Sequence, residues 1–418
     1  MNVTPQPRHV ILSDDSLGAG RRCVPKTRRD NDLREAVLHL FSQSLHPQAG
    51  VFTQISRREW DHLLTWLDVS GLALYFLDRM REIGLLRKLP QLVVEQLQGN
   101  LHDNSQRTLG MIAESIAIQQ GFQSNSIRYA VLKGISLCPS AVLRPELRHQ
   151  FDLDYLVADT DADKARRVLE RLGYSTHAES ERCWEFKKGE SPTVTAKDLY
   201  KDLPYRGVEL HLEHSTVAGF SGLDQVISQT MHGMTMPLLS PIALFISHAM
   251  DVFKDICSSF IRASHLLEFY RHVLTRFDDD RFWNELQHRV AGDRNTRLGI
   301  AVVSYLITSL MGEFAPDILT TWSICELSPA TRLWIDRYGR QAAFATPPGT
   351  KLYLLLRREL ELDSVLPRQT LRTSLLPSRL PRAVMRASRD EDLSTRIARY
   401  RAQARFSLSR LRFHCIEG

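Results

Sequence analysis

The chain has 418 residues, 43% of them hydrophobic, which is enough for about two or three packed domains. The formal net charge is +6 and the isoelectric point is near 9.0, which is compatible with a polyanionic partner and equally with a merely basic surface. No apolar run reaches the roughly 18–20 residues of a membrane span, and the N-terminus lacks the apolar segment of a secretory signal. The six cysteines form no C-x-x-C pair, which indicates reduced thiols in the cytoplasm and argues against a disulfide framework or a zinc site.

The chain begins with two regions of different character. Residues 1–30 are rich in proline, glycine and arginine and show no apolar period, so we expect a disordered segment. Residues 31–125 repeat apolar residues at helical spacing, which predicts an N-terminal helical region. Within it, one helix is expected to start at Pro90 and a separate long one to cover 101–120.

Residues 126–236 change to strand character and are predicted to form the core. The run 127–132 is a short strand that ends before Gly134 and Ser136, and a helix is expected from Leu137. A strand, a Gly-x-Ser turn and a helix can handle phosphate, because glycine lets the backbone approach closely and a helix N-terminus favours anions. An ordinary strand–helix turn has the same pattern and remains the alternative.

The most informative stretch is 150–157, which alternates polar and apolar residues as a half-buried strand does. Asp152 and Asp154 therefore point to the same side, roughly 6–7 Å apart along the strand. Two carboxylates held side by side repel each other unless a cation lies between them, and oxygen ligands suit Mg²⁺. Two solvated aspartates at a strand end are the alternative interpretation.

A second polar strand face follows further along the chain. After an expected helix at 161–172 and an expected strand at 183–186, the run 206–214 alternates cleanly, with Glu209 and His211 on its polar face. A carboxylate on a strand beside the aspartate pair would complete a metal cage. A zinc pair of His211 with the histidine three residues later needs a helix, and the alternation argues against one. A solvated strand face is the remaining alternative.

The C-terminal half returns to helical patterns. Residues 237–345 are predicted to be a helical region, and its two histidines His248 and His265 are interpreted as packed or surface residues. Helices are expected from Pro241 onward and at 259–275, 280–290, 296–311 and 328–343. Residues 346–418 are predicted to be arginine-rich C-terminal helices and tail. One helix is expected at 353–362 and a basic amphipathic one at 393–411, which would suit a membrane surface or an acidic partner, or present a solvated arginine face.

Four short runs occur in a fixed order along the chain: Val-Leu-Lys-Gly (131–134), Arg-x-x-x-Asp-Leu-Asp-Tyr-Leu-Val (148–157), Leu-Gly-Tyr (172–174) and Val-Glu-Leu-His (208–211). In this order they resemble the polymerase-beta-like nucleotidyltransferase superfamily, and more narrowly the bacterial uncharacterised nucleotidyltransferases found near polysaccharide and natural-product genes. The resemblance covers about residues 35–380. The usual Gly-Gly or Gly-Ser doublet is replaced by Gly-Ile-Ser at 134–136, and the gap to Asp152 is longer than in minimal nucleotidyltransferases.

The resemblance implies an α+β fold, with a small mixed β-sheet nucleotidyltransferase core flanked by N- and C-terminal helical regions. It also implies that Asp152, Asp154 and Glu209 are the catalytic carboxylates and hold two Mg²⁺ ions, which clamp the attacking and leaving oxygens of an in-line displacement. The reaction would move a nucleoside monophosphate, AMP by default, from a triphosphate to a hydroxyl or similar group. The acceptor would be a small molecule, a sugar or a peptide in polysaccharide or natural-product biosynthesis.

The remaining site residues follow from the same resemblance. Gly134 and Ser136 would contact the β- and γ-phosphates, and Lys133 and Arg148 would stabilise the triphosphate. Arg148 as a salt-bridge partner within the fold is the alternative. His211 would orient the neighbouring glutamate or simply fill the polar face. Other functions stay open: a protein acceptor, a catalytically silent scaffold or binding protein in a biosynthetic complex, and a nucleic-acid binder. The last ranks lowest, because basic patches interleaved with aromatic residues are missing from the sequence.

Overall fold

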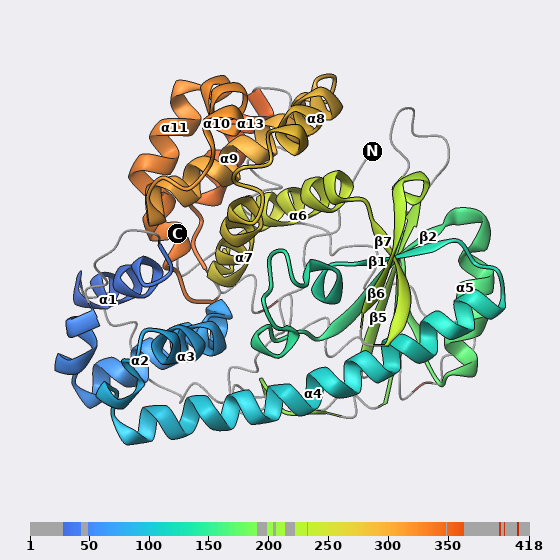
Figure 1. Ribbon diagram of the computed structural model, residues 1–418, viewed down its shortest axis with the longest axis horizontal. Helices are drawn as coiled ribbons and strands as arrows, with labels where there is room; N and C mark the ends of the chain where they lie inside the picture. The colour runs from blue at the N-terminus through green and yellow to red at the C-terminus, as the bar shows by residue number, and fades with distance from the viewer. Residues whose placement is uncertain are drawn as a thin grey trace.

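A mixed β-sheet lies at one side of the molecule and helices form the rest (Figure 1). The computed structural model describes residues 28–42, 49–189, 199–203, 206–213, 222–231, 233–347 and 349–362, with the single positions 393, 397 and 408. The expected disordered segment 1–30 lies outside the described residues up to position 27. Apart from the three single positions, so does the expected basic helix 393–411. No helix of the described part is long and apolar enough to cross a membrane.

Within the described residues the sheet has seven strands in the order β3-β4-β5-β2-β1-β7-β6. The strands are β1 (Tyr129–Leu132), β2 (Asp152–Ala158), β3 (Ser175–Glu179), β4 (Cys183–Lys188), β5 (Arg206–Glu213), β6 (Val226–Met231) and β7 (Met234–Leu239). β2 runs parallel to β5 and β1 runs parallel to β7, whereas the other neighbours are antiparallel. The expected mixed sheet flanked by helices is thereby confirmed.

Alternation along β2 decides which side of the sheet is available for chemistry. Leu153, Tyr155 and Val157 are buried in an apolar cluster with residues of β5 and of the two helices α4 (Gln91–Ser124) and α5 (Ala162–Arg171). Burying each of these side chains contributes about 1.5–3 kcal/mol, so the register of β2 is strongly fixed. The aspartates of β2 consequently point to the opposite face, as the sequence predicts.

Helix α4 is one helix of 34 residues, and the prediction of two separate helices here was wrong. Gly99 and Gly110 lie inside it, and each costs about 1 kcal/mol relative to alanine. Tertiary contacts offset this cost. Buried Asn104, for example, donates from Nδ2 to the carbonyl oxygens of Glu146 and Arg148 at 2.8 and 3.2 Å. The helix therefore runs unbroken from α3 to the sheet along the lower edge of Figure 1.

The helices before and after the sheet share one large apolar core. They are α1 (Arg28–His39), α2 (Arg57–Ser70), α3 (Ala73–Glu82), α6 (Pro241–Ile256), α7 (Ala263–Leu274), α8 (Asp280–Val290), α9 (Arg294–Met311), α10 (Asp317–Ser323), α11 (Pro329–Trp334), α12 (Arg340–Ala343) and α13 (Tyr353–Leu362). The ring of Trp66 in α2 packs edge-on against Phe344, with centroids 6.1 Å apart. The N-terminal and C-terminal helices are thus packed together although the sheet separates them in sequence.

Several expected elements have other boundaries or were missed. The predicted helix 328–343 is interrupted by a π-helical turn at Ile335–Gly339. Strand β3, helix α10 and the hairpin β6–β7 were not expected, and a helical pattern had been assigned from residue 237 onward. Pro237 lies within β7 opposite Ser228, and a proline in a strand weakens the sequence signal for one.

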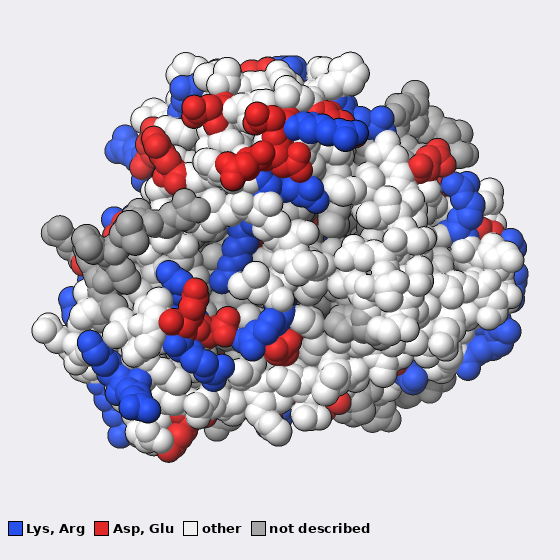
Figure 2. All heavy atoms as spheres, viewed as in Figure 1, with Lys and Arg blue, Asp and Glu red and all other residues white. Residues whose placement is uncertain are grey.

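Charged side chains do not gather into one basic region on the face shown in Figure 2. Basic and acidic residues are interspersed there over the helical part, and the surface over the sheet carries few charges. On this face, the basic side chains of the described residues therefore form no continuous patch.

Two buried histidines face each other between α6 and α7. His248 and His272 lie 3.1 Å apart between their Nδ1 atoms and are 6% and 1% exposed. Burial, together with the charge of Arg276, lowers the pKa of His272 to about 3. Burial and the charge of His272 likewise lower the pKa of His248. Both rings are packed residues, as the sequence predicts for His248.

We expect this pair to make the fold sensitive to acid. An unfolded chain takes up a proton on each histidine below about pH 6.5, whereas folded His272 stays neutral down to about pH 3, so stability present above pH 6.5 is lost as the pH falls. His272 alone should lower the free energy of unfolding by about 2 kcal/mol when the pH falls from about 8 to about 5. Urea unfolding at both pH values measures this loss, and the loss should be smaller in His272→Asn. An equal loss in the variant and the wild type would contradict the prediction.

Candidate active site

Three carboxylates converge on the face of the sheet that α4 and α5 do not cover. β2 and β5 pair in parallel with Asp154 opposite Glu209, so side chains in register on the two strands point the same way. Asp152, two residues earlier, shares this face. Oxygen atoms of Asp152, Asp154 and Glu209 all lie within 4.8 Å of one another, close enough to bind one cation together. The expected convergence of three acidic side chains from two strands is thus present.

Two further side chains already contact these carboxylates. Lys133 follows β1 directly, beside Asp154, and its Nζ lies 2.9 Å from Asp154 Oδ1. His211 lies on the same face of β5 as Glu209, and its Nε2 is 3.0 Å from Asp154 Oδ1 and 3.5 Å from Glu209 Oε2. Asp154 is almost fully buried, whereas His211 and Glu209 are partly exposed. The site can therefore be reached from the Glu209 side.

The pKa values differ among the three carboxylates because their partners differ. Burial alone would raise the pKa of Asp154, but the charges of Lys133 and His211 outweigh it and hold that pKa below its ordinary value. Burial and the charge of Asp154 raise the pKa of Asp152. Burial, followed by the charges of the two aspartates, raises the pKa of Glu209 to about 8. Burial and crowding thus disfavour the charged forms of Asp152 and Glu209, an effect that a bound cation would reverse.

Cys183 is a neighbour of the site that was not predicted. On antiparallel β4 it lies directly opposite His211, and its Sγ is 4.0 Å from Glu209 Oε2. Cys183, Glu209 and His211 form a second group whose possible ligand atoms all lie within 4.8 Å of one another. Such a sulfur–nitrogen–oxygen set suits a softer metal than the carboxylate set does. The sequence places Cys183 on a strand but gives no register for that strand.

The turn after β1 differs from the expected phosphate-binding arrangement. Residues Gly134–Leu137 form a short 3₁₀ helix, and no α-helix follows within the described segment before β2. Pro139 disfavours helical backbone at the residue before it, which explains the absence of a helix from Leu137. Ser136 is buried and donates from Oγ to the carbonyl oxygen of Lys133 at 2.8 Å. The described stretch between β1 and β2 therefore offers no α-helix N-terminus to a phosphate.

Gly134 is required by the shape of this turn. Its φ is +36°, and a Cβ built on it would overlap the side chain of Gln150, which itself donates from Nε2 to the carbonyl oxygen of Asp152 at 2.6 Å. We expect Gly134→Ala to lower the free energy of unfolding by about 1–3 kcal/mol. Thermal and urea unfolding measure the change.

Gly99→Ala is the matched control for that substitution. A Cβ added to Gly99, inside α4, would have no heavy atom within 4 Å, so the same methyl group should stabilise the protein by about 0.5–1 kcal/mol. Equal effects of the two substitutions would show that the turn at Gly134 is not sterically constrained.

Arg148 is committed to an ion pair within the fold. Its Nε lies 3.1 and 3.2 Å from the two carboxylate oxygens of Glu268, a residue of α7 that is fully buried. Glu268 also accepts a hydrogen bond of 2.9 Å from Tyr75 Oη. Of the two roles the sequence left open for Arg148, the structural salt bridge is therefore present.

The chemistry of this arrangement is that of a cation site beside cationic side chains. Carboxylate oxygens are hard donors that suit Mg²⁺, and strands hold their spacing more rigidly than loops would. Lys133 supplies a positive charge at the same point. Together they can neutralise a phosphate ester and its leaving group without a cysteine or serine nucleophile.

A family model described as "Uncharacterised nucleotidyltransferase" matches residues 56–315, which include β1, β2 and β5. The crystal structure of an antigenic nucleotidyltransferase-like protein from Paracoccidioides brasiliensis is similar over 44% of this chain and 90% of that chain, at 12% identity and a TM-score of 0.27. No curated protein matches the chain. Because the family model spans more than half of the chain, the protein belongs to the family of uncharacterised nucleotidyltransferases and is a nucleotidyltransferase.

Proposed function

We propose that the protein transfers a nucleoside monophosphate in a Mg²⁺-dependent reaction, with ATP as the first donor to test. The acceptor would be a hydroxyl or similar group of a small molecule, sugar or peptide made in polysaccharide or natural-product biosynthesis. The observation that carries the proposal is the convergence of Asp152, Asp154 and Glu209 within 4.8 Å on two parallel strands.

In this proposal the acceptor oxygen forms a bond to the α-phosphorus while the bond from that phosphorus to the bridging oxygen breaks. Pyrophosphate leaves with the electron pair, and the hydroxyl proton passes to solvent. Asp152, Asp154 and Glu209 would hold Mg²⁺, which when bound supplies positive charge to the α-phosphate and its leaving group. The strands fix the three carboxylates in place, so little reorganisation accompanies the reaction.

The other predicted residues have the following proposed roles. Lys133, ion-paired with Asp154, would turn to the phosphates once a cation neutralises that carboxylate. His211 would keep Asp154 oriented by its hydrogen bond and Glu209 by the contact of 3.5 Å between His211 Nε2 and Glu209 Oε2. Gly134 would let the backbone approach the phosphates, with Ser136 shaping the turn behind it.

The experiment is incubation of the full chain with Mg²⁺, each of the four nucleoside triphosphates and candidate acceptors, including peptides encoded by neighbouring genes. Mass spectrometry should show an acceptor heavier by one nucleoside monophosphate, with an equal amount of pyrophosphate released. ATP with Mg²⁺, but not AMP, should also raise the melting temperature. If no triphosphate binds, the chain is instead a catalytically silent scaffold or binding protein.

A further inference from the structure

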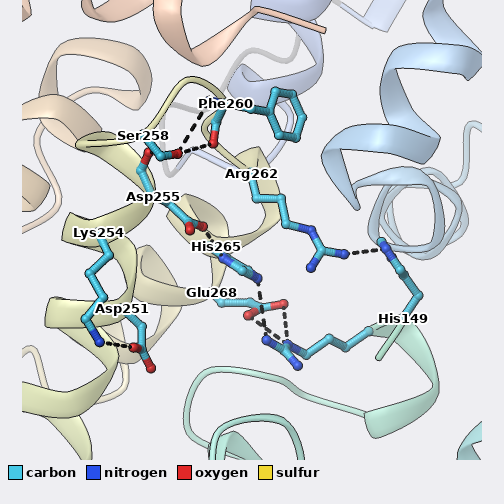
Figure 3. A network of polar contacts seen from close by, with 10 residues as sticks. His149, Asp251, Lys254, Asp255, Ser258, Phe260, Arg262, His265 and Glu268 are labelled. Atoms are coloured by element: carbon cyan, nitrogen blue, oxygen red, sulfur yellow. Dashed lines mark hydrogen bonds and ion pairs between the residues drawn. The ribbon is translucent and has the colours of Figure 1, made fainter. Parts of the chain in front are cut away.

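A network of polar contacts joins the segment just before β2 to α6 and α7 (Figure 3). Arg148 is ion-paired with Glu268, and its Nη2 lies 3.5 Å from Nε2 of His265. The other ring nitrogen of His265 is 2.6 Å from Asp255 Oδ2. Glu268 and Asp255, the two buried carboxylates of this network, are thus both engaged by side chains other than Arg262.

Arg262 is the cation of the network with the most unused donors. Its guanidinium donates to Nε2 of His149, and among the described residues it forms no ion pair with a carboxylate. A guanidinium carries several N–H donors in a planar fork that matches phosphate oxygens. The residue is partly exposed to solvent. In Figure 3 it extends from the start of α7 toward His149.

Arg262 lies beside the segment that leads into β2. The residue to which it donates, His149, is three residues before Asp152 and directly follows Arg148. Burial, followed by the charge of Arg148, lowers the pKa of Arg262, whereas the charges of Asp255 and Glu268 raise it. A bound anion would offset the repulsion between the two guanidinium groups.

We propose that Arg262 binds the β- and γ-phosphates of the nucleoside triphosphate, at the side of the carboxylate site that faces α7. This inference rests on the proposed function, since it names the residue that would hold the leaving pyrophosphate. Arg262 itself makes and breaks no covalent bond. It neutralises charge on the phosphates, a role for which Arg148 is less suited because Glu268 already occupies its guanidinium.

Binding of inorganic tripolyphosphate tests this proposal without requiring turnover. Calorimetry should show that the wild-type chain binds tripolyphosphate and that Arg262→Gln weakens binding by about tenfold to a hundredfold. Arg262→Lys should keep part of the affinity, because it retains the charge but not the fork. Arg297→Gln, which removes a partly exposed, ion-paired arginine of α9, should leave affinity unchanged. Circular dichroism confirms that each variant is folded.

The outcomes separate this inference from the proposed function. Tripolyphosphate binding that depends on Arg262, in a chain that turns over no triphosphate, would support the phosphate site and overturn the transferase function. Turnover with an unchanged KM for Mg-ATP in Arg262→Gln would support the function and overturn the inference. Orthophosphate binding as tightly as tripolyphosphate would overturn the polyphosphate assignment and point to a phosphorylated acceptor instead.

Discussion

Asp152→Asn should abolish transfer and at the same time make the metal-free protein more stable. The carboxylate is held next to Asp154, and burial and that charge raise the pKa of Asp152, so the folded state disfavours its charged form. A neutral amide of the same shape removes this repulsion. Losing a metal ligand should lower the rate of pyrophosphate release on the order of a thousandfold. In EDTA the variant should therefore unfold at a higher urea concentration than the wild type does. Added Mg²⁺ should no longer stabilise the variant.

The control for this prediction is Asp163→Asn. Asp163 is an exposed residue of α5 that pairs with Arg166 on the surface, so the same carboxylate-to-amide change should alter neither activity nor Mg²⁺-dependent stability. Undiminished turnover in Asp152→Asn would remove this residue from the mechanism. Lower stability in EDTA would contradict the repulsion between the aspartates.

Glu268→Gln should cause the largest loss of stability. It leaves Arg148 without its carboxylate, although that side chain is only 15% exposed. Removing one partner of a buried ion pair costs about 3–5 kcal/mol, because the remaining charge is poorly solvated. Equilibrium urea unfolding measures the difference from wild type.

Glu326→Gln makes the same chemical change in an exposed ion pair. Glu326 and its partner Arg297 are 39% and 27% exposed, so we expect a loss of less than about 1 kcal/mol. Similar losses in the two variants would mean that the pair of Arg148 and Glu268 contributes little to the fold.

The parts of the site that the sequence predicts are those set by strand alternation. The side-chain period of two places Asp152 and Asp154 on the same face of their strand, whatever the rest of the fold. It likewise places Glu209 and His211 on the same face of theirs. These side chains converge only if β2 and β5 are adjacent and in register. The family resemblance implied this arrangement, and the pairing of the two strands shows it. Apolar spacing likewise predicted α8 and α13 with their observed boundaries.

The remaining features depend on contacts between distant segments. Cys183 comes next to Glu209 only through the pairing of β4 with β5. Arg262 lies more than a hundred residues after β2, in a stretch with no motif, and only the packing of α7 brings it near Asp152. Local sequence also misled at α4, which was predicted as two helices and is one, with buried hydrogen bonds of Asn104 along it.

Helix α4 connects the two sides of the molecule mechanically. With 34 residues it is about 50 Å long. A rigid tilt of the helix by about 2° about one end would displace its other end by about 2 Å. One end packs on α3, while Ser115, farther along, hydrogen-bonds at 2.9 Å to Tyr155, next to Asp154 in β2. A tilt of α4 would therefore reach the strand that carries the aspartates through the hydrogen bond between Ser115 and Tyr155.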